Sequence, residues 1–168
     1  MKILSGSHGR WMFIVLGLTG AAVLTSGGWA LAAEGQQGVK TTPVLTTDSP
    51  DLKWQDIGDL PPGAKVAVLA QSGDWSVARV KFPPHYVVPP HSHPNAEAVW
   101  LISGQVGFGF GDKVDQTGPW LKPGAFFALQ PGGKHYVWTG DEGGIIDVQV
   151  SAPGGITFVN PADAPKKK

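Results

Sequence analysis

The chain has 168 residues, which is enough for one ordinary domain. Its 13 basic and 13 acidic side chains cancel, and no cluster of lysine and arginine lies among aromatic residues, which argues against a nucleic-acid partner. The sequence has no cysteine, so disulfides and thiolate ligands are excluded, and a metal would have to be held by histidine and carboxylate side chains. With 24 glycines and 15 prolines, the composition favours short strands and frequent turns.

The N-terminal segment, residues 1–33, is predicted to be a secretory signal peptide. Its only charges are two basic residues near the start, an apolar stretch follows over residues 11–24, and small residues suggest cleavage near Ala32 or Ala33. The competing interpretation is an uncleaved membrane anchor, because the uncharged segment is long enough to span a bilayer, although its glycines and hydroxyl residues weaken it. Either interpretation predicts a periplasmic or secreted domain, with membrane contact only if the segment is uncleaved.

Two further polar segments flank the predicted domain. Residues 34–50 lack apolar periodicity and are expected to form a flexible spacer. Residues 161–168 end in three lysines and are expected to be a flexible, solvated tail. The domain itself is therefore placed at residues 51–160.

Within this domain, the chain alternates between apolar runs and turn residues. Residues 66–69 form one apolar run, and residues 75–82 are predicted to be a strand that places Ala78, Val80 and Phe82 on one face. Such a strand is typical of a sheet with one buried face.

Three more strand-like stretches follow. Residues 96–112 are predicted to be two strands that meet in a tight hairpin turn at Ser103–Gly104. Another pair is broken at Pro131–Gly133, and Ile146, Val148 and Val150 share one face of the last stretch. No 3.6-residue apolar pattern is visible after the N-terminal segment, so the fold class is predicted to be an all-β sandwich or barrel.

The stretch "PPHSHPNAE", residues 89–97, is the strongest candidate for chemistry. On an extended chain, the odd-numbered His91, His93 and Glu97 point to one face, and the apolar residues that follow mark that face as the interior. Two imidazoles and a carboxylate buried without partners would be costly, and a divalent cation would compensate. The available fourth donor is His135, which follows the Pro131–Gly133 turn.

This pattern resembles the two sequence motifs of the cupin superfamily. Four of the five fixed positions of the first motif match, at His91, His93, Glu97 and Gly104. The leading glycine of that motif is replaced by His85. In the second motif, the eleven-residue step from Gly124 to His135 is kept, whereas the proline is displaced by one position and the asparagine is replaced by Thr139. The resemblance covers about residues 55–160, and several stretches further resemble a single-domain bacterial cupin subgroup.

The resemblance implies a small antiparallel jelly-roll barrel with one metal site. The implied ligands are His91, His93, Glu97 and His135, and the implied cofactor is a divalent transition metal such as Fe, Mn, Ni or Zn. The leading hypothesis is a small-molecule metalloenzyme of dioxygenase, isomerase or decarboxylase type, in which Glu97 is the candidate catalytic base. The alternatives are a non-catalytic sensor or binding module for a metal or small ligand, and a structural barrel with a vestigial site. The resemblance also implies a homodimer.

Other polar residues are given less specific roles. His85 follows two prolines and is expected to be a turn residue, with a fifth ligand or an acid–base group as the alternative. Thr139 and Gln149 are candidate hydrogen-bond donors to the ligands, although Gln149 fits plain outer surface equally well. Asp112 and Asp115 are expected to lie in a solvated loop.

Overall fold

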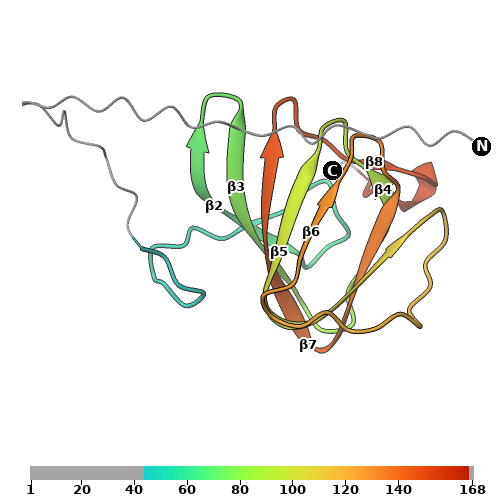
Figure 1. Ribbon diagram of the computed structural model, residues 1–168, viewed down its shortest axis with the longest axis horizontal. Coiled ribbons are helices and arrows are strands. Elements are labelled where there is room, and N and C mark those ends of the chain that lie inside the picture. The colour runs from blue at the N-terminus through green and yellow to red at the C-terminus, as the bar shows by residue number, and fades with distance from the viewer. Residues whose placement is uncertain (1–43, 167–168) are drawn as a thin grey trace, which may run out of the picture. The chain divides into compact units, whose positions relative to one another are not determined.

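The computed structural model describes residues 44–166 of the chain, and these residues form an all-β fold (Figure 1). This confirms the predicted fold class. The described elements, in chain order, are β1 (Gln55–Asp56), β2 (Lys65–Ser72), β3 (Trp75–Phe82), β4 (Val87–Ser92), β5 (Glu97–Phe110), β6 (Phe126–Leu129), β7 (His135–Ser151), β8 (Thr157–Phe158) and the 3-10 helix η1 (Pro161–Asp163).

The long strand β7 connects two parts of a curled antiparallel sheet. Its first half pairs with β4 and with the second half of β5, and its second half pairs with β3 and the first half of β5. The strands β1, β2 and β6 extend the second part, and β8 extends the first. Because β5 and β7 belong to both parts, the sheet folds over on itself and encloses an interior (Figure 1).

The interior faces of β5 and β7 change parity where these strands bend. In β5 the buried apolar side chains are Val99 and Leu101 before the bend and Val106 after it, and the pairing register shifts between them. Gly104 lies at this shift with a φ of 87°, and an added Cβ there would come within 2.4 Å of the carbonyl oxygen of Gly143. Only glycine combines this backbone conformation with so close an approach.

The hairpin predicted at Ser103–Gly104 is therefore wrong, because β5 runs without interruption from Glu97 to Phe110. The same glycine is suited to a tight turn and to a bulge at a barrel corner, since both require a positive φ. The sequence alone did not distinguish a turn from a bulge. The structure shows a bulge, because the ladder between β5 and β7 continues on both sides of Gly104.

The core confirms the alternation predicted for β3. Ala78, Val80 and Phe82 are all buried and belong to one apolar cluster. The cluster also contains Val99, Leu101, Val106, Val137, Ile146 and Val148. Side chains from both parts of the sheet therefore meet in a single core, which is what fixes the strands that carry the candidate site.

Outside the barrel, glycines of β5 accommodate aromatic rings of β7. Gly107 lies opposite Trp138 and Gly109 lies opposite Tyr136, and an added Cβ at either glycine would come within 2.4 Å of the facing ring. These rings cover the glycine backbone in the manner of a cross-strand aromatic–glycine pair. This packing holds the first half of β7 against β5, and His135 stands at the start of that half.

The predictions for the N-terminal segment lie outside the described residues. In residues 44–166, no helix has the length and the apolar character needed to cross a membrane. The described part of the predicted spacer contains a turn at Thr46–Ser49, whose side chains bond to one another. The predicted tail begins with η1, where the side-chain oxygen of Asn160 accepts a hydrogen bond from the backbone N–H of Ala162.

Candidate metal centre

The four candidate ligands come from neighbouring ends of three strands and one turn. His91 lies near the end of β4, and it pairs in the ladder with His135, the first residue of β7. His93 lies in the turn after β4, and Glu97 is the first residue of β5. The barrel therefore gathers segments about forty residues apart at one end of its interior.

The three histidines form a tight group. One ring nitrogen from each of His91, His93 and His135 lies within 4.8 Å of the others. The ring centroids of His91 and His135 are 4.1 Å apart, and that of His93 is 5.0 Å and 5.3 Å from them. This group could hold a metal ion, as three imidazoles do in many metal sites.

Backbone carbonyl groups orient all three rings. The Nδ1 atom of His91 lies 2.7 Å from the carbonyl oxygen of Pro89, that of His93 lies 2.7 Å from the oxygen of Gly155, and that of His135 lies 3.1 Å from the oxygen of Gly133. A carbonyl oxygen can only accept, so each Nδ1 carries the proton. In its neutral form, each ring then has a lone pair on Nε2, which is the arrangement found in metal-binding histidines.

Glu97 lies against two of the three imidazoles. Its Oε2 atom is 3.5 Å from Nε2 of His93 and 3.8 Å from Nε2 of His135. Two donor atoms that are each about 2.1 Å from one ion lie at most about 4.2 Å apart, so both distances allow a shared metal. The carboxylate would add a negative charge to three neutral nitrogens, which suits a divalent cation.

Burial keeps the rings of the two more deeply buried histidines, His91 and His135, neutral near pH 7. It lowers the pKa of His91 to about 3, and the nearby His135 and His93 contribute further in the same direction. It lowers the pKa of His135 to about 4, again with a smaller effect from His93. Burial raises the pKa of the Glu97 carboxyl group, and His93 opposes that change. Neutral imidazoles near pH 7 are the form that binds metals.

A cavity of about 290 Å³ adjoins the group. All four candidate ligands contribute to its wall, and most of the remaining wall is apolar. A bound ion would therefore face a partly open, largely apolar space in which a small molecule could reach it.

The candidate ligands lie close together as predicted, but not for the geometric reason expected from the sequence. His91, His93 and Glu97 do not lie on one extended strand, because a turn separates β4 from β5 and the β4 register shifts between Val88 and His91. The convergence comes from this turn and from the pairing of β4 with β7. Sequence reasoning also missed the carbonyl partners of the rings, since backbone carbonyls carry no residue-specific signal.

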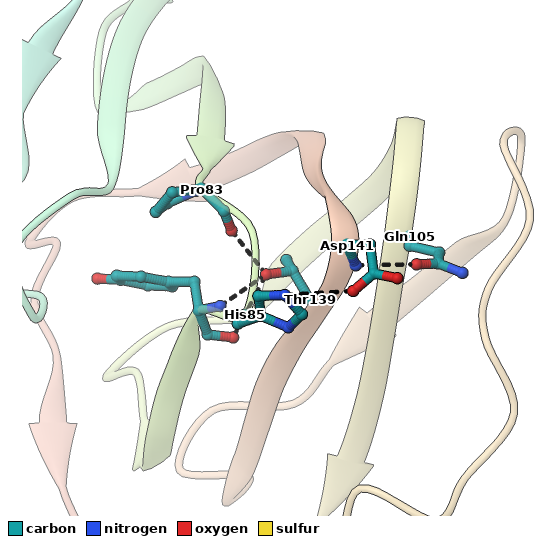
Figure 2. A network of polar contacts seen from close by, with 6 residues as sticks. Pro83, His85, Gln105, Thr139 and Asp141 are labelled. Atoms are coloured by element: carbon teal, nitrogen blue, oxygen red, sulfur yellow. Dashed lines mark hydrogen bonds and ion pairs between the residues drawn. The ribbon is translucent and has the colours of Figure 1, made fainter.

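Two candidate hydrogen-bond donors do not reach the histidines. Gln149 is exposed on the outer face of β7, as the alternative interpretation expected. Thr139 is buried, but its Oγ1 atom accepts from the backbone N–H of Tyr86 and donates to the carbonyl oxygen of Pro83 (Figure 2). Both of its hydrogen-bonding roles are thus fulfilled at the beginning of β4, away from His91 at its end.

His85 is a turn residue, as predicted. It has a φ of 55°, in the left-handed region that the leading glycine of the motif would favour, and it lies just before β4. Its Nε2 atom is 3.2 Å from Oδ1 of Asp141, and both side chains are exposed (Figure 2). It does not line the cavity. Asp112 and Asp115 are surface residues, paired with Lys134 and hydrogen-bonded to Thr117 respectively.

The fold and the histidine group together define a cupin-type barrel. The family model described as the ChrR cupin-like domain matches residues 42–146. The chain belongs to this family, and hence to the cupin superfamily. No curated protein matches the chain.

Solved structures show the same fold at low sequence identity. A cupin-2 domain from Rhodospirillum rubrum has 12% identity and a TM-score of 0.56, covering 71% of this chain and 82% of that one. The polyketide cyclase RemF from Streptomyces resistomycificus has 16% identity and a TM-score of 0.54, covering 72% and 90%. The DMSP lyase DddQ from Ruegeria pomeroyi DSS-3 has 18% identity and a TM-score of 0.52, covering 64% and 60%.

Proposed function

We propose that this cupin binds a divalent transition metal through His91, His93, His135 and Glu97, and that it uses the metal to act on a small molecule. The observation that carries the proposal is the orientation of the rings. Three imidazoles from two distant segments donate Nδ1–H to fixed backbone carbonyls, so that the Nε2 atoms of the neutral rings are available within one small group.

The proposed activity is that of a metalloenzyme of dioxygenase, isomerase or decarboxylase type. A metal held by three imidazoles and one carboxylate supplies a Lewis acid or redox centre with open coordination positions. The enzymes named among the similar structures, a lyase and a cyclase, agree with a small-molecule substrate. The apolar cavity wall would exclude water from the bound substrate.

Glu97 is the proposed catalytic base. Its carboxylate lies between His93 and His135 and lines the cavity, so it can contact both the metal and a substrate proton. Burial raises the pKa of its carboxyl group, and a general base works best when its pKa lies near the working pH, because it must both accept and release a proton. The protein supplies this position because Glu97 opens β5 and pairs with Leu129 and Val150 on either side.

The second candidate function is a non-catalytic module that senses or sequesters a metal or small ligand. One observation favours it. Among the described residues that line the cavity, Asp59 is the only titratable group besides the four proposed ligands, and its side chain is exposed. A sensor needs no further acid or base, whereas many enzymes do.

We further propose that the domain works in the periplasm or outside the cell, and that it forms a homodimer. The first proposal rests on the signal-peptide pattern of residues 1–33 and the second on the resemblance to dimeric cupins. Fractionation of cells that express the full chain, together with the molar mass of the purified protein in solution, tests both.

Metal analysis followed by a turnover screen separates the two candidate functions. A stoichiometric redox-active metal with oxygen uptake or substrate turnover supports the enzyme. Stoichiometric zinc without turnover supports the sensor. Protein that takes up none of Fe, Mn, Ni or Zn contradicts the metalloenzyme and the metal sensor, and leaves only a module that binds a small ligand without a metal.

The His93→Ala variant tests the assignment of the site. We expect the metal affinity to fall by about tenfold or more, because one of three nitrogen donors is lost, while the barrel stays folded. The side chain of His93 is partly exposed, so its removal leaves little unfilled space. Equal metal content in the variant and the parent protein contradicts the assignment.

A further inference from the structure

The cavity is polar at the candidate metal group and apolar beyond it. The strand register arranges its wall in layers. The first layer holds the histidines and Glu97, which pairs with Val150; the next holds Val99 paired with Val148; and the layer after that contains Ile146. Moving along β7 from Val150 to Ile146 therefore leads away from the proposed metal and into an aliphatic interior.

The apolar layers contain few groups that could form hydrogen bonds or ion pairs with a polar ligand. No lysine or arginine of residues 44–166 lines the cavity. The side-chain amide of Asn95, which also lines the cavity, already donates to the carbonyl oxygens of Ser151 and Pro153. A polyol or a multiply charged anion that entered these layers would lose hydrogen bonds to water without replacement, at a considerable cost in free energy.

The proposed metal position and the apolar layers thus favour one class of ligand. We infer that the ligand is amphiphilic, with a head of adjacent oxygen atoms that chelates the metal and a short, uncharged hydrocarbon tail that fills the cavity beyond Glu97. This inference rests on the proposed metal site. The cavity, at about 290 Å³, lies at the small end of the usual range for ligand sites, so the tail must be short.

A series of alkylhydroxamates with Co²⁺-loaded protein tests this ligand class. All members carry the same chelating head, and the visible absorption of Co²⁺ reports when that head binds. We expect the affinity to rise about fourfold for each added methylene until the cavity is full, because each buried methylene is removed from water. A tail of the same length that ends in a carboxylate should lose this gain.

Two cavity variants and one outer-face variant locate the tail. Val148→Phe blocks the layer next to the metal, and Ile146→Phe blocks the deeper one. The affinity should stop rising at a shorter chain in Val148→Phe than in Ile146→Phe. Gln149→Phe, in the same strand but exposed outside the barrel, should match the parent protein. If Val148→Phe fails to fold, Val148→Leu replaces it. If Ile146→Phe fails to fold, Val80→Leu replaces it, because Val80 pairs with Ile146, lines the same layer and gains one methylene.

The outcomes separate this inference from the metal site on which it rests. Failure of the parent protein to take up Co²⁺ contradicts the metal site itself. Uptake of Co²⁺ and binding of hydroxamates with no dependence on chain length overturns the amphiphilic ligand and leaves the metal site standing. A chain-length gain that neither cavity variant shortens also overturns the inference, because the tail then lies elsewhere.

Discussion

Polar residues lie at both ends of the barrel. The hydrogen bonds that they make differ between the two ends. At the end that begins β4, Thr139 both accepts and donates a hydrogen bond within the protein, and Gln105 accepts from the backbone N–H of Asp141 (Figure 2). At the other end, each of three histidines has one nitrogen bonded to the backbone and, when the ring is neutral, a second nitrogen with a lone pair.

This contrast distinguishes structural polar groups from candidate functional ones. A buried polar group that is fully bonded within the protein stabilises the fold and has nothing left for a ligand. A cluster of buried nitrogens that share a small space with unbonded lone pairs is costly for the apo protein and becomes favourable when a cation binds. Substitutions at the two ends should therefore affect different measurements.

The largest effect is expected from His135→Ala. This residue is the most deeply buried of the three histidines, with 3% of its surface exposed, and its loss should reduce the metal affinity by about 100-fold or more. Competition with a chromogenic chelator measures the change. Retention of parent-like affinity would mean that His135 is not a ligand.

The matched substitution at the other end is Thr139→Val, which keeps the shape and removes the hydroxyl group. The backbone N–H of Tyr86 then loses its acceptor in a buried position, and the free energy of unfolding should fall by about 2 kcal/mol. Urea denaturation measures this loss. The metal affinity should stay within about twofold of the parent value, and a larger drop would show that the two ends are coupled.

Acid should destabilise the metal-free protein. The pKa values of His91 and His135 are lowered in the fold to about 3 and about 4, so between pH 6.5 and 5 the unfolded chain takes up protons that the folded protein does not. The contribution of these two histidines to the free energy of unfolding is therefore present above pH 6.5 and is lost as the pH falls. The raised pKa of Glu97 acts in the opposite sense, so we expect a net loss of about 1–2 kcal/mol over this range.

Denaturation of chelator-treated protein at pH 6.5 and pH 5 measures this loss. His135→Ala serves as the control, since it removes one of the two groups and should reduce the pH dependence. A pH-independent free energy of unfolding in the parent protein would contradict the assignment of neutral, buried imidazoles.

The smallest effect is expected at His85, which has a positive φ. His85→Gly should stabilise the protein by up to about 1 kcal/mol, because glycine adopts this conformation without steric cost. His85→Val should destabilise it by about 1–2 kcal/mol, since a β-branched residue is poorly suited to the left-handed region. The exposed contact with Asp141 contributes little. Equal stability of the two variants, measured by thermal unfolding, would show that the turn relaxes.

Several features were predictable from sequence because they depend on local chemistry. The turn residues and the alternation of β3 predicted an all-β fold, and His85 was correctly placed in a turn. The spacing of His91, His93 and His135 predicted a shared group, and the structure brings these three together. The corner at Gly104 was mistaken for a hairpin, because a bulge and a turn require the same residue type.

The amino-acid sequence by itself determined the residue types that could bind a metal, the all-β class and the absence of thiolate ligands, because these follow from composition and short-range periodicity. The tertiary structure alone decided which ring nitrogens are left with lone pairs and which polar groups are fully bonded. That distinction depends on where backbone carbonyls such as those of Gly133 and Gly155 lie once β4, β5 and β7 have paired. Carbonyl positions are a property of the folded backbone, and no residue type encodes them locally.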